Sequence, residues 1–223
     1  MSTKLFISAI AKFLLGVVLV GALIFVPAGT LNYLGGIIFM SIIFIPMFIA
    51  GIVMMIKSPE LLAKRLNAKE KEKEQGIVVK LSGIMFLCGF ILAGLDFRYG
   101  WFVLPLWVNI VASVVFFISY ILYAEVMREN AYLSRTIEVQ EGQKVVDTGL
   151  YGIVRHPMYA VTLPLFLSMP LILGSLVSLA VFLVYPFLIA ARILNEEKVL
   201  TEGLEGYKEY KEKVKYRLIP FIW

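Results

Sequence analysis

The sequence has very little of what metal centres and disulfide-stabilised domains require. It contains one cysteine, Cys88, and one histidine, His156, among 223 residues. Because Cys88 lies within an apolar run, the chain has neither a disulfide framework nor a thiolate metal site, and one histidine excludes a histidine-rich metal centre. A glycine-rich phosphate loop, a paired-histidine motif and a nucleophile elbow are also absent from the sequence. We therefore expect no bound metal.

Charge is sparse as well. Charged residues make up 17% of the chain, whereas hydrophobic residues make up 60% and the mean hydropathy is +0.87. A soluble domain of this size needs fewer apolar residues for its core, so the composition indicates an integral membrane protein. The net charge of +5 then reflects orientation in the membrane, and we expect no nucleic-acid partner. No small-residue cleavage site follows the first apolar run, which is therefore expected to be a retained span.

The sequence predicts an all-α polytopic membrane protein with about six transmembrane helices, since a helix needs about 20 residues to cross a bilayer. The apolar runs are residues 5–26, 34–56, 77–95, 102–124, 158–173 and 176–193. Only Gly174 and Ser175 separate the last two, which predicts a tight antiparallel hairpin. A short helix is expected after Ser58-Pro59-Glu60, because these residue types favour a helix start. A charged helix is expected in the tail beyond Glu196.

The basic residues are distributed unevenly between the two sides of the predicted spans. Every Lys and Arg except Arg98 falls on the side that holds both termini, the 57–80 loop and the 125–156 loop. The positive-inside rule places that side in the cytoplasm. Within it, the charge run at 69–74 is typical of a solvated loop. Ile137, Val139, Val145 and Val146 flank Glu141-Gly142, a weak pattern for a short β-hairpin.

One stretch concentrates polar chemistry directly before an apolar run. Residues 149–159 contain Tyr151, Arg155, His156, Pro157 and Tyr159. Proline suits the first turn of a helix and restricts the residue before it, so Arg155 and His156 are expected at a helix mouth. Free N–H groups at such a mouth favour anions. The same residues also suit an interfacial anchor, so at this point a structural and a functional interpretation both stand.

A second polar group follows the last apolar run. The predicted hairpin brings its two open ends together, so Arg192, Glu196 and Glu197 are expected near His156. Arg192 and Glu196 are four residues apart and share a helix face. They form either a simple interfacial ion pair or part of a functional site, because ionisable groups near the hydrocarbon boundary are costly to keep.

Residues 149–159 closely resemble the G-x-Y-x-x-x-R-H-P-x-Y motif of the isoprenylcysteine carboxyl methyltransferase family, which is grouped with the phospholipid methyltransferases. Three further blocks occur in the family's order: residues 134–146 before the motif, then Arg192-x-x-x-Glu196-Glu197, then Tyr207-Lys-Glu-Tyr210 with the 218–221 segment. The resemblance covers roughly the last hundred residues and implies a prokaryotic type of membrane enzyme that uses S-adenosyl-L-methionine.

The resemblance also implies a set of site residues. Arg192 and Glu196 would be catalytic, with Arg192 facing the substrate. The cofactor would be held by Gln140, Gln143, Lys144, Val145, Val146, Tyr151, His156, Pro157, Met158, Tyr159, Glu196 and Glu197. Two positions depart from the family pattern. The stretch between Glu197 and Tyr207 is one residue shorter, and Gln143 stands where the eukaryotic enzymes tend to have histidine.

The implied activity is methyl transfer to a lipophilic acceptor, a carboxylate by preference, that enters from the bilayer. Membrane lipids would be the surrounding partners, and the enzyme would lie in a prokaryotic inner membrane with its active site facing the cytoplasm. By this resemblance, residues 1–76 hold two helices and a charged loop, whereas residues 77–223 form the methyltransferase core. Two alternatives remain: a steroid or sterol reductase that uses NADPH, and a non-catalytic lipid-binding protein.

Overall fold

The computed structural model describes residues 3–66, 73–130, 132 and 139–223. This part of the chain is helical and contains no strand. Its elements in chain order are α1 (Thr3–Ala28), α2 (Leu34–Lys57), α3 (Pro59–Leu66), α4 (Lys73–Tyr99), α5 (Leu106–Glu129), η1 (Gly149–Gly152), α6 (Pro157–Ile172), α7 (Leu176–Phe182), α8 (Tyr185–Gly203) and α9 (Tyr207–Lys213). The predicted all-α membrane architecture is therefore confirmed.

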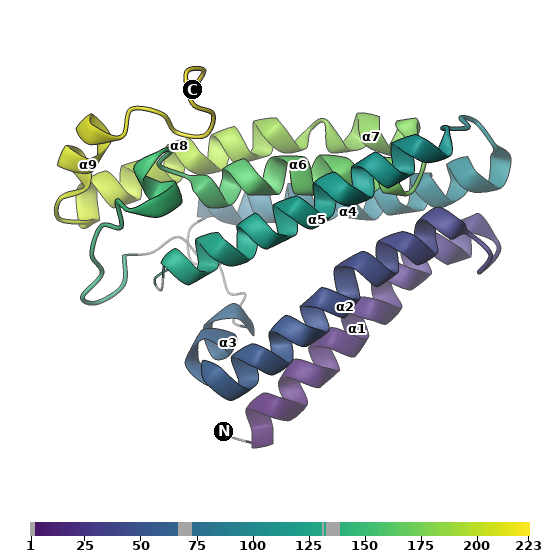
Figure 1. Ribbon diagram of the computed structural model, residues 1–223, viewed down its shortest axis with the longest axis horizontal. Helices are drawn as coiled ribbons and strands as arrows, with labels where there is room; N and C mark the ends of the chain where they lie inside the picture. Colours follow the sequence, from purple (N-terminus) through teal and green to yellow (C-terminus); the bar gives the residue numbers. More distant parts are fainter. Residues whose placement is uncertain (1–2, 67–72, 131, 133–138) are drawn as a thin grey trace.

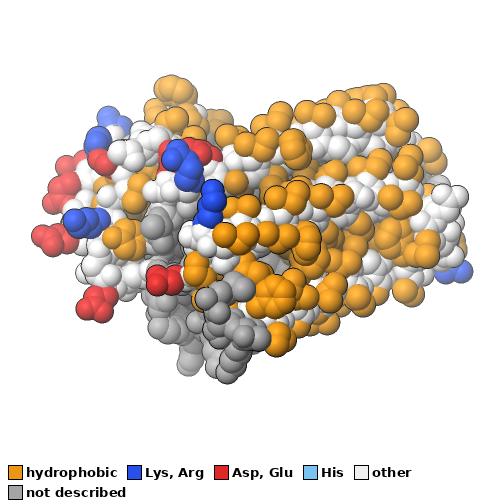
Figure 2. Space-filling model, turned by 60° about the horizontal axis from the view of Figure 1, so that its bottom comes forward, with side chains coloured by type: hydrophobic (Ala, Val, Ile, Leu, Met, Phe, Trp, Pro, Cys, Tyr) orange, Lys and Arg blue, Asp and Glu red, His pale blue; other side chains and the backbone are white. Residues whose placement is uncertain are grey.

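Five helices are long and apolar enough to span a membrane within the described residues: Leu5–Ala28, Leu34–Lys57, Gly76–Tyr99, Leu106–Glu129 and Leu176–Gly203. The fifth predicted span, residues 158–173, corresponds to α6, which has only 16 residues and contains Pro164 and Pro170. Figure 2 shows hydrophobic side chains over most of the body and most of the charged side chains gathered at one end. The molecule is an integral membrane protein with one strongly charged end.

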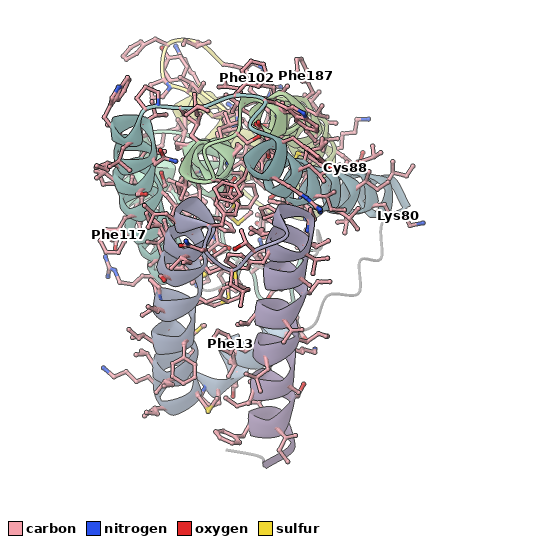
Figure 3. The ribbon with its side chains drawn as sticks, turned by 90° about the vertical axis from the view of Figure 1, so that its right-hand side faces the viewer. Phe13, Lys80, Cys88, Phe102, Phe117 and Phe187 are labelled. Carbon is pink, nitrogen blue, oxygen red and sulfur yellow. The ribbon has the colours of Figure 1, made fainter. Side chains whose placement is uncertain are left out.

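The helices form two groups that meet at one end. α4 to α8 make a bundle, whereas α1 and α2 pair with each other and diverge from it toward the charged end (Figures 1 and 3). At the crossing, a Cβ on Gly94 would lie 2.4 Å from the carbonyl oxygen of Ile24, so only glycine lets α4 approach α1 this closely. Away from the crossing, Phe13 packs against Phe44 and Phe48 between the two diverging helices (Figure 3).

The main core lies inside the bundle and at the crossing. Phe90, Phe116 and Phe182 are fully or almost fully buried there, and Phe39 of α2 joins them. Ring pairs connect Phe39 to Phe90 and to Phe116, so the aromatic contacts tie the α2 arm to the bundle. This core fixes the positions of α6 and α8, whose charged-end turns carry the polar residues described below.

Three details differ from the sequence-based prediction. The fourth span begins at Leu106 and not at residue 102, because Pro105 takes an extended conformation before the helix. The second arm of the hairpin is interrupted between α7 and α8, where Pro186 lies at the start of α8 and cannot donate an N–H to a preceding turn. Residues 139–146 form a turn at Glu141-Gly142 without strands, and Ile137 lies outside the described residues.

Other predictions at this level are confirmed. α6 begins at Pro157 with His156 as its N-cap, so Arg155 and His156 do lie at a helix mouth. Gly174 and Ser175 make the tight turn after α6. The expected short helix after Ser58 is α3, and the charged tail helix is α9. The charge run at 69–74 lies largely outside the described residues.

Candidate functional site

The motif begins with a glycine whose surroundings leave no room for a side chain. Gly149 has φ +51°, and a Cβ there would lie 1.6 Å from a carboxylate oxygen of Glu129. That carboxylate accepts a hydrogen bond from the N–H of Leu150 at 3.0 Å. Glu129, at the end of α5, thereby fixes the start of η1 and with it the position of Tyr151.

Arg155 and His156 hold the tail of the chain. Their backbone N–H groups donate to the carbonyls of Tyr216 and Arg217, each at 2.9 Å. The Arg155 guanidinium donates through Nη1 to the carbonyls of Val214 and Lys215 at 2.8 and 2.9 Å. Two residues of the motif therefore satisfy four consecutive carbonyls, 214–217. We call this set of bonds the tail clasp.

Glu197 is the acceptor at the centre of a buried ionic cluster. Its Oε1 accepts from Nε of Arg155 at 2.7 Å and lies 3.4 Å from Nε2 of His156. Its Oε2 accepts from Nε of Arg217 at 2.9 Å. Arg155, His156 and Glu197 are all buried. A buried charge persists only when it is paired and hydrogen-bonded, and here one carboxylate joins the motif, α8 and the tail.

Arg192 and Glu196 meet through the phenol of Tyr159. Nε of Arg192 donates to the Tyr159 oxygen at 2.9 Å, and that hydroxyl donates to Oε2 of Glu196 at 2.6 Å. The ring of Tyr159 also stacks near that of His156, with centroids 5.8 Å apart. The motif and the polar residues of α8 were predicted to lie close together, and Tyr159, the last residue of the motif, makes this contact. Its hydroxyl orients both Arg192 and Glu196.

A pocket opens between the motif, the charged-end half of α8 and α9. Its empty space is about 810 Å³, including the part open to solvent. Ten of the residues expected at the site line it: Gln143, Lys144, Val145, Val146, Tyr151, His156, Met158, Tyr159, Arg192 and Glu196. Segments more than 40 residues apart in the sequence therefore share one concave surface, which is the usual form of a small-molecule site.

Three expected contacts lie outside the pocket lining. Gln140 sits in the turn before it, where its side-chain nitrogen donates to the carbonyl of Tyr132 at 2.5 Å. Pro157 is buried as the first residue of α6. Glu197 belongs to the ionic cluster behind Arg155 and His156. In this structure Gln140 and Glu197 do not line the pocket but bond to or lie close to residues that do: Tyr132, Arg155 and His156.

The pocket also has lining residues outside the predicted set of cofactor and substrate contacts: Asn130, Tyr132, Arg155, Leu200, Leu204, Tyr207 and Tyr210. Tyr210 donates its hydroxyl to the carbonyl of Tyr151 at 2.7 Å. Tyr207 is only 3% exposed, and its hydroxyl has no hydrogen-bond partner within the described part of the chain. Burial, and then the charges of Glu197 and Glu196, raise the pKa of Tyr207 well above its ordinary value, so the phenol stays protonated.

The position of these tyrosines explains why their role is hard to read from the sequence. Tyr207 and Tyr210 are three residues apart on α9, a spacing that also suits an amphipathic helix lying on a membrane surface. In the structure they pack with Leu204 and Val214 in a small core beside the pocket. The signal that distinguishes the two cases is the burial of a polar oxygen, which only the structure supplies.

Comparison with known proteins covers the segment that carries most of the pocket lining. Residues 103–202 match the model of the isoprenylcysteine carboxyl methyltransferase (ICMT) family. The match includes α5, the motif, α6, α7 and most of α8, and it supports a membrane methyltransferase. The resemblance found in the sequence is confirmed over this segment.

Two curated proteins are similar to part of the chain. The Delta(14)-sterol reductase TM7SF2 of Mus musculus is 31% identical over 91 residues, which are 40% of this chain and 22% of that protein. The uncharacterized protein YpbQ of Bacillus subtilis (strain 168) is 31% identical over 97 residues, which are 43% of this chain and 57% of that protein. The matches span less than two thirds of either relative.

Proposed function

We propose that this protein transfers a methyl group from S-adenosylmethionine to the carboxylate of a lipophilic molecule that enters from the bilayer. The pocket carries the proposal. Within the segment that matches the ICMT family, it gathers Arg192, Glu196 and His156 on one surface with residues 143–146. An arginine beside a carboxylate offers an anchor for an anion and a partner for a cation, as a cationic methyl donor and an anionic acceptor require.

The pocket residues fit such a donor. The buried hydroxyl of Tyr207 has no partner in the described chain, although a buried polar group normally finds one, so a bound ligand would satisfy it. Glu196 would pair with a positive charge on the cofactor, whereas the turn at 140–143 would border it. Bound S-adenosylmethionine would supply a methyl group already activated as a sulfonium substituent.

The remaining work for the protein is alignment and exclusion of water. Arg192, held through Nε by Tyr159, would orient two carboxylate oxygens of the acceptor. A carboxylate carries no proton to remove, so the reaction needs no general base, and His156 is expected to act as a cofactor contact. Holding donor and acceptor in line is the main contribution that such a site makes to the rate.

The first experiment asks which ligand the purified protein binds. We expect S-adenosylhomocysteine to bind and NADPH not to bind, as measured by calorimetry. Glu196→Gln should weaken S-adenosylhomocysteine about ten- to a hundredfold, the loss of roughly 1.5–3 kcal/mol that follows removal of a charged partner. Glu202→Gln, on the same helix but exposed, is the matched control. Equal affinities for the two variants would remove Glu196 from the cofactor site.

The second experiment tests the acceptor. Arg192→Lys keeps the charge but loses the planar fork, so the variant should bind S-adenosylhomocysteine normally and lose on the order of a hundredfold in transfer to lipophilic acids. Arg128→Lys, at an exposed surface pair, is the control. The assay is transfer from labelled cofactor to a panel of acids, amines and thiols. Undiminished transfer to an acid by Arg192→Lys would exclude Arg192 as the substrate anchor.

A reductase is the second candidate, and one observation favours it: the 31% identity with the sterol reductase over 91 residues. The ligand experiment separates the two functions directly. NADPH binding that Glu196→Gln and Tyr207→Phe weaken, without S-adenosylhomocysteine binding, would favour the reductase. Binding of neither cofactor would favour a lipid-binding protein.

We also propose that the pocket faces the cytoplasm of a prokaryotic cell from its inner membrane. The distribution of Lys and Arg supports this orientation, because all but Arg98 lie on the pocket side of the predicted spans. A cysteine introduced at Glu212 in a Cys88→Ser background should react with an impermeant reagent only after the cells are opened. Labelling in intact cells would show that the pocket faces the outside and would contradict the proposed orientation.

A further inference from the structure

The segment that follows Arg217 folds into a compact turn, residues 218–223. The N–H groups of Leu218 and Ile219 donate to the oxygen of Trp223 at 2.9 and 3.1 Å, and those of Ile222 and Trp223 donate to the carbonyl of Ile219 at 3.1 Å. Pro220 has no N–H. Four of the five N–H groups in the turn are therefore satisfied within it. A backbone whose N–H groups are mostly satisfied internally loses fewer hydrogen bonds when water is withdrawn from around it.

The turn has two faces of different character. Leu218 is buried and Trp223 partly buried, and both pack against the main core. On the other face Phe221 is 88% exposed and Ile222 76% exposed. The backbone φ of Phe221 is +66°. Among the described residues, no other non-glycine residue has a positive φ. A bulky residue is seldom held in this conformation, and such strain is commonly found at functional positions.

The turn lies beside the lipid-facing surface of α8. Nε of Arg217 bonds to Glu197, and Leu194, one helical turn earlier on α8, is an exposed apolar residue. Figure 1 places the C-terminal marker alongside α8, inward of α9. Figure 2 shows that the surface with charged side chains directly adjoins the surface with hydrophobic side chains. The exposed face of the turn thus continues the apolar surface that membrane lipids cover.

Arg217 adds a charge of the appropriate sign at this boundary. Its side chain is about one third exposed, and its guanidinium carbon lies 5.4 Å from the centre of the Trp223 ring. Within the ionic cluster two arginines share one carboxylate, so a positive charge remains. Basic and aromatic side chains together are typical of the level of lipid head groups.

We propose that residues 217–223 form a membrane-interface anchor whose partner is the lipid surface at the charged end. Phe221 and Ile222 enter the boundary between head groups and acyl chains, while Arg217 lies at the level of the phosphates. Because Arg217 also bonds to Glu197 and its carbonyl accepts from His156, contact with lipid stabilises the tail clasp and the pocket wall behind it. This anchor does not depend on the identity of the cofactor or acceptor.

The experiment measures where the turn lies in a bilayer. In a Cys88→Ser background, single cysteines at Phe221, Ile222 and, as the control on the exposed side of α9, Glu212 carry an environment-sensitive fluorophore. The full chain is placed one copy per phosphatidylcholine–phosphatidylglycerol nanodisc, without ligand. We expect blue-shifted emission and quenching by spin-labelled lipid at 221 and 222, whereas the label at 212 is quenched by a water-soluble quencher only.

Two results would overturn the anchor. Labels at 221 and 222 that are as open to the aqueous quencher as the label at 212 would place the turn in water. Labels shielded from both quenchers would show that protein covers it. A fluorophore at Ile219 provides a second test: its quenching by lipid should fall to the level of position 212 with Phe221→Glu and Ile222→Glu together. The pair Phe221→Leu and Ile222→Leu should leave it unchanged.

Discussion

The two ends of the molecule each bury a carboxylate, and the two carboxylates are used differently. Asp96, near the α4–α5 turn, accepts from the N–H of Phe102 at 2.9 Å and from the hydroxyl of Ser175 at 2.5 Å. Glu197, near the pocket, accepts from two arginines and lies close to His156. Neutral donors satisfy Asp96, whereas Glu197 is satisfied by charges.

The difference follows from what each carboxylate holds together. Asp96 joins two short turns, since Ser175 also caps α7 by accepting from the N–H of Ser178. Glu197 joins α8 to the motif and to a tail that has no regular structure of its own at residues 214–217. Neutral hydrogen bonds suffice where helix packing has already fixed the partners. Residues 214–217 belong to no helix, and there a charged cluster fixes the position of the chain as well as stabilising it.

The largest expected effect comes from neutralising the carboxylate at the charged end. Glu197→Gln leaves Arg155 and Arg217 without a counter-charge, and breaking a buried ion pair costs about 3–5 kcal/mol. The variant should unfold at a lower temperature in detergent and should release the tail to trypsin at Lys213 and Lys215. Glu205→Gln, at an exposed position, is the control. Unchanged tail proteolysis would show that packing alone holds the segment.

A smaller effect is expected at the opposite end. Asp96→Asn keeps one acceptor oxygen and replaces the other with a donor, so one bond to Phe102 or Ser175 is lost at a cost of about 1–3 kcal/mol. Thermal unfolding should register this loss. The affinity for S-adenosylhomocysteine should stay at the wild-type value, because the pocket lies at the other end of the bundle. A fall in affinity as large as that expected for Glu196→Gln would contradict the separation of the two ends.

The smallest expected effect concerns two buried hydroxyls, one near each end. The hydroxyls of Tyr207 and Ser178 both lack a hydrogen-bond partner among the described residues, but only Tyr207 lines the pocket. Removing an unsatisfied group is nearly neutral for folding, so Tyr207→Phe and Ser178→Ala should both keep the unfolding temperature. Tyr207→Phe should weaken S-adenosylhomocysteine roughly fivefold, the loss of one bond of about 1 kcal/mol. Equal affinities for both variants would show that the Tyr207 hydroxyl makes no bond to the ligand and that its ring only lines the pocket.

Much of the fold follows from the sequence because apolar runs and turn residues are local signals. The spans, the tight turn at Gly174-Ser175 and the helix start at Pro157 needed no knowledge of distant contacts. The break between α7 and α8 was missed because the apolar run continues through it. The proposed hairpin at 137–146 was a weak pattern, and the described part of that segment forms a turn that borders the pocket.

The candidate site was predictable in its members but not in its connections. The hairpin argument brought Arg192 and Glu196 toward His156, and the structure places all three on one pocket. Nothing local indicates that the phenol of Tyr159 bridges Arg192 and Glu196, or that Arg155 bonds to the tail. The Tyr159 bridge depends on how α6 packs against α8. The bonds of Arg155 depend on the path of residues 204–217, which carries mixed charge and little periodicity. The assignment of the predicted site residues to a cofactor stays a prediction.

The tail clasp is made entirely to main-chain oxygens. Every residue type offers the same carbonyl, so Lys215 and Tyr216 are open to substitution as far as Arg155 and His156 are concerned. The tail clasp therefore depends on the number of residues between α8 and residue 214 and not on their type. One insertion or deletion there would present each donor with the neighbouring carbonyl. The resemblance to the family pattern implies that the stretch between Glu197 and Tyr207 is one residue shorter than usual, so the spacing here is the feature to compare when related chains are aligned.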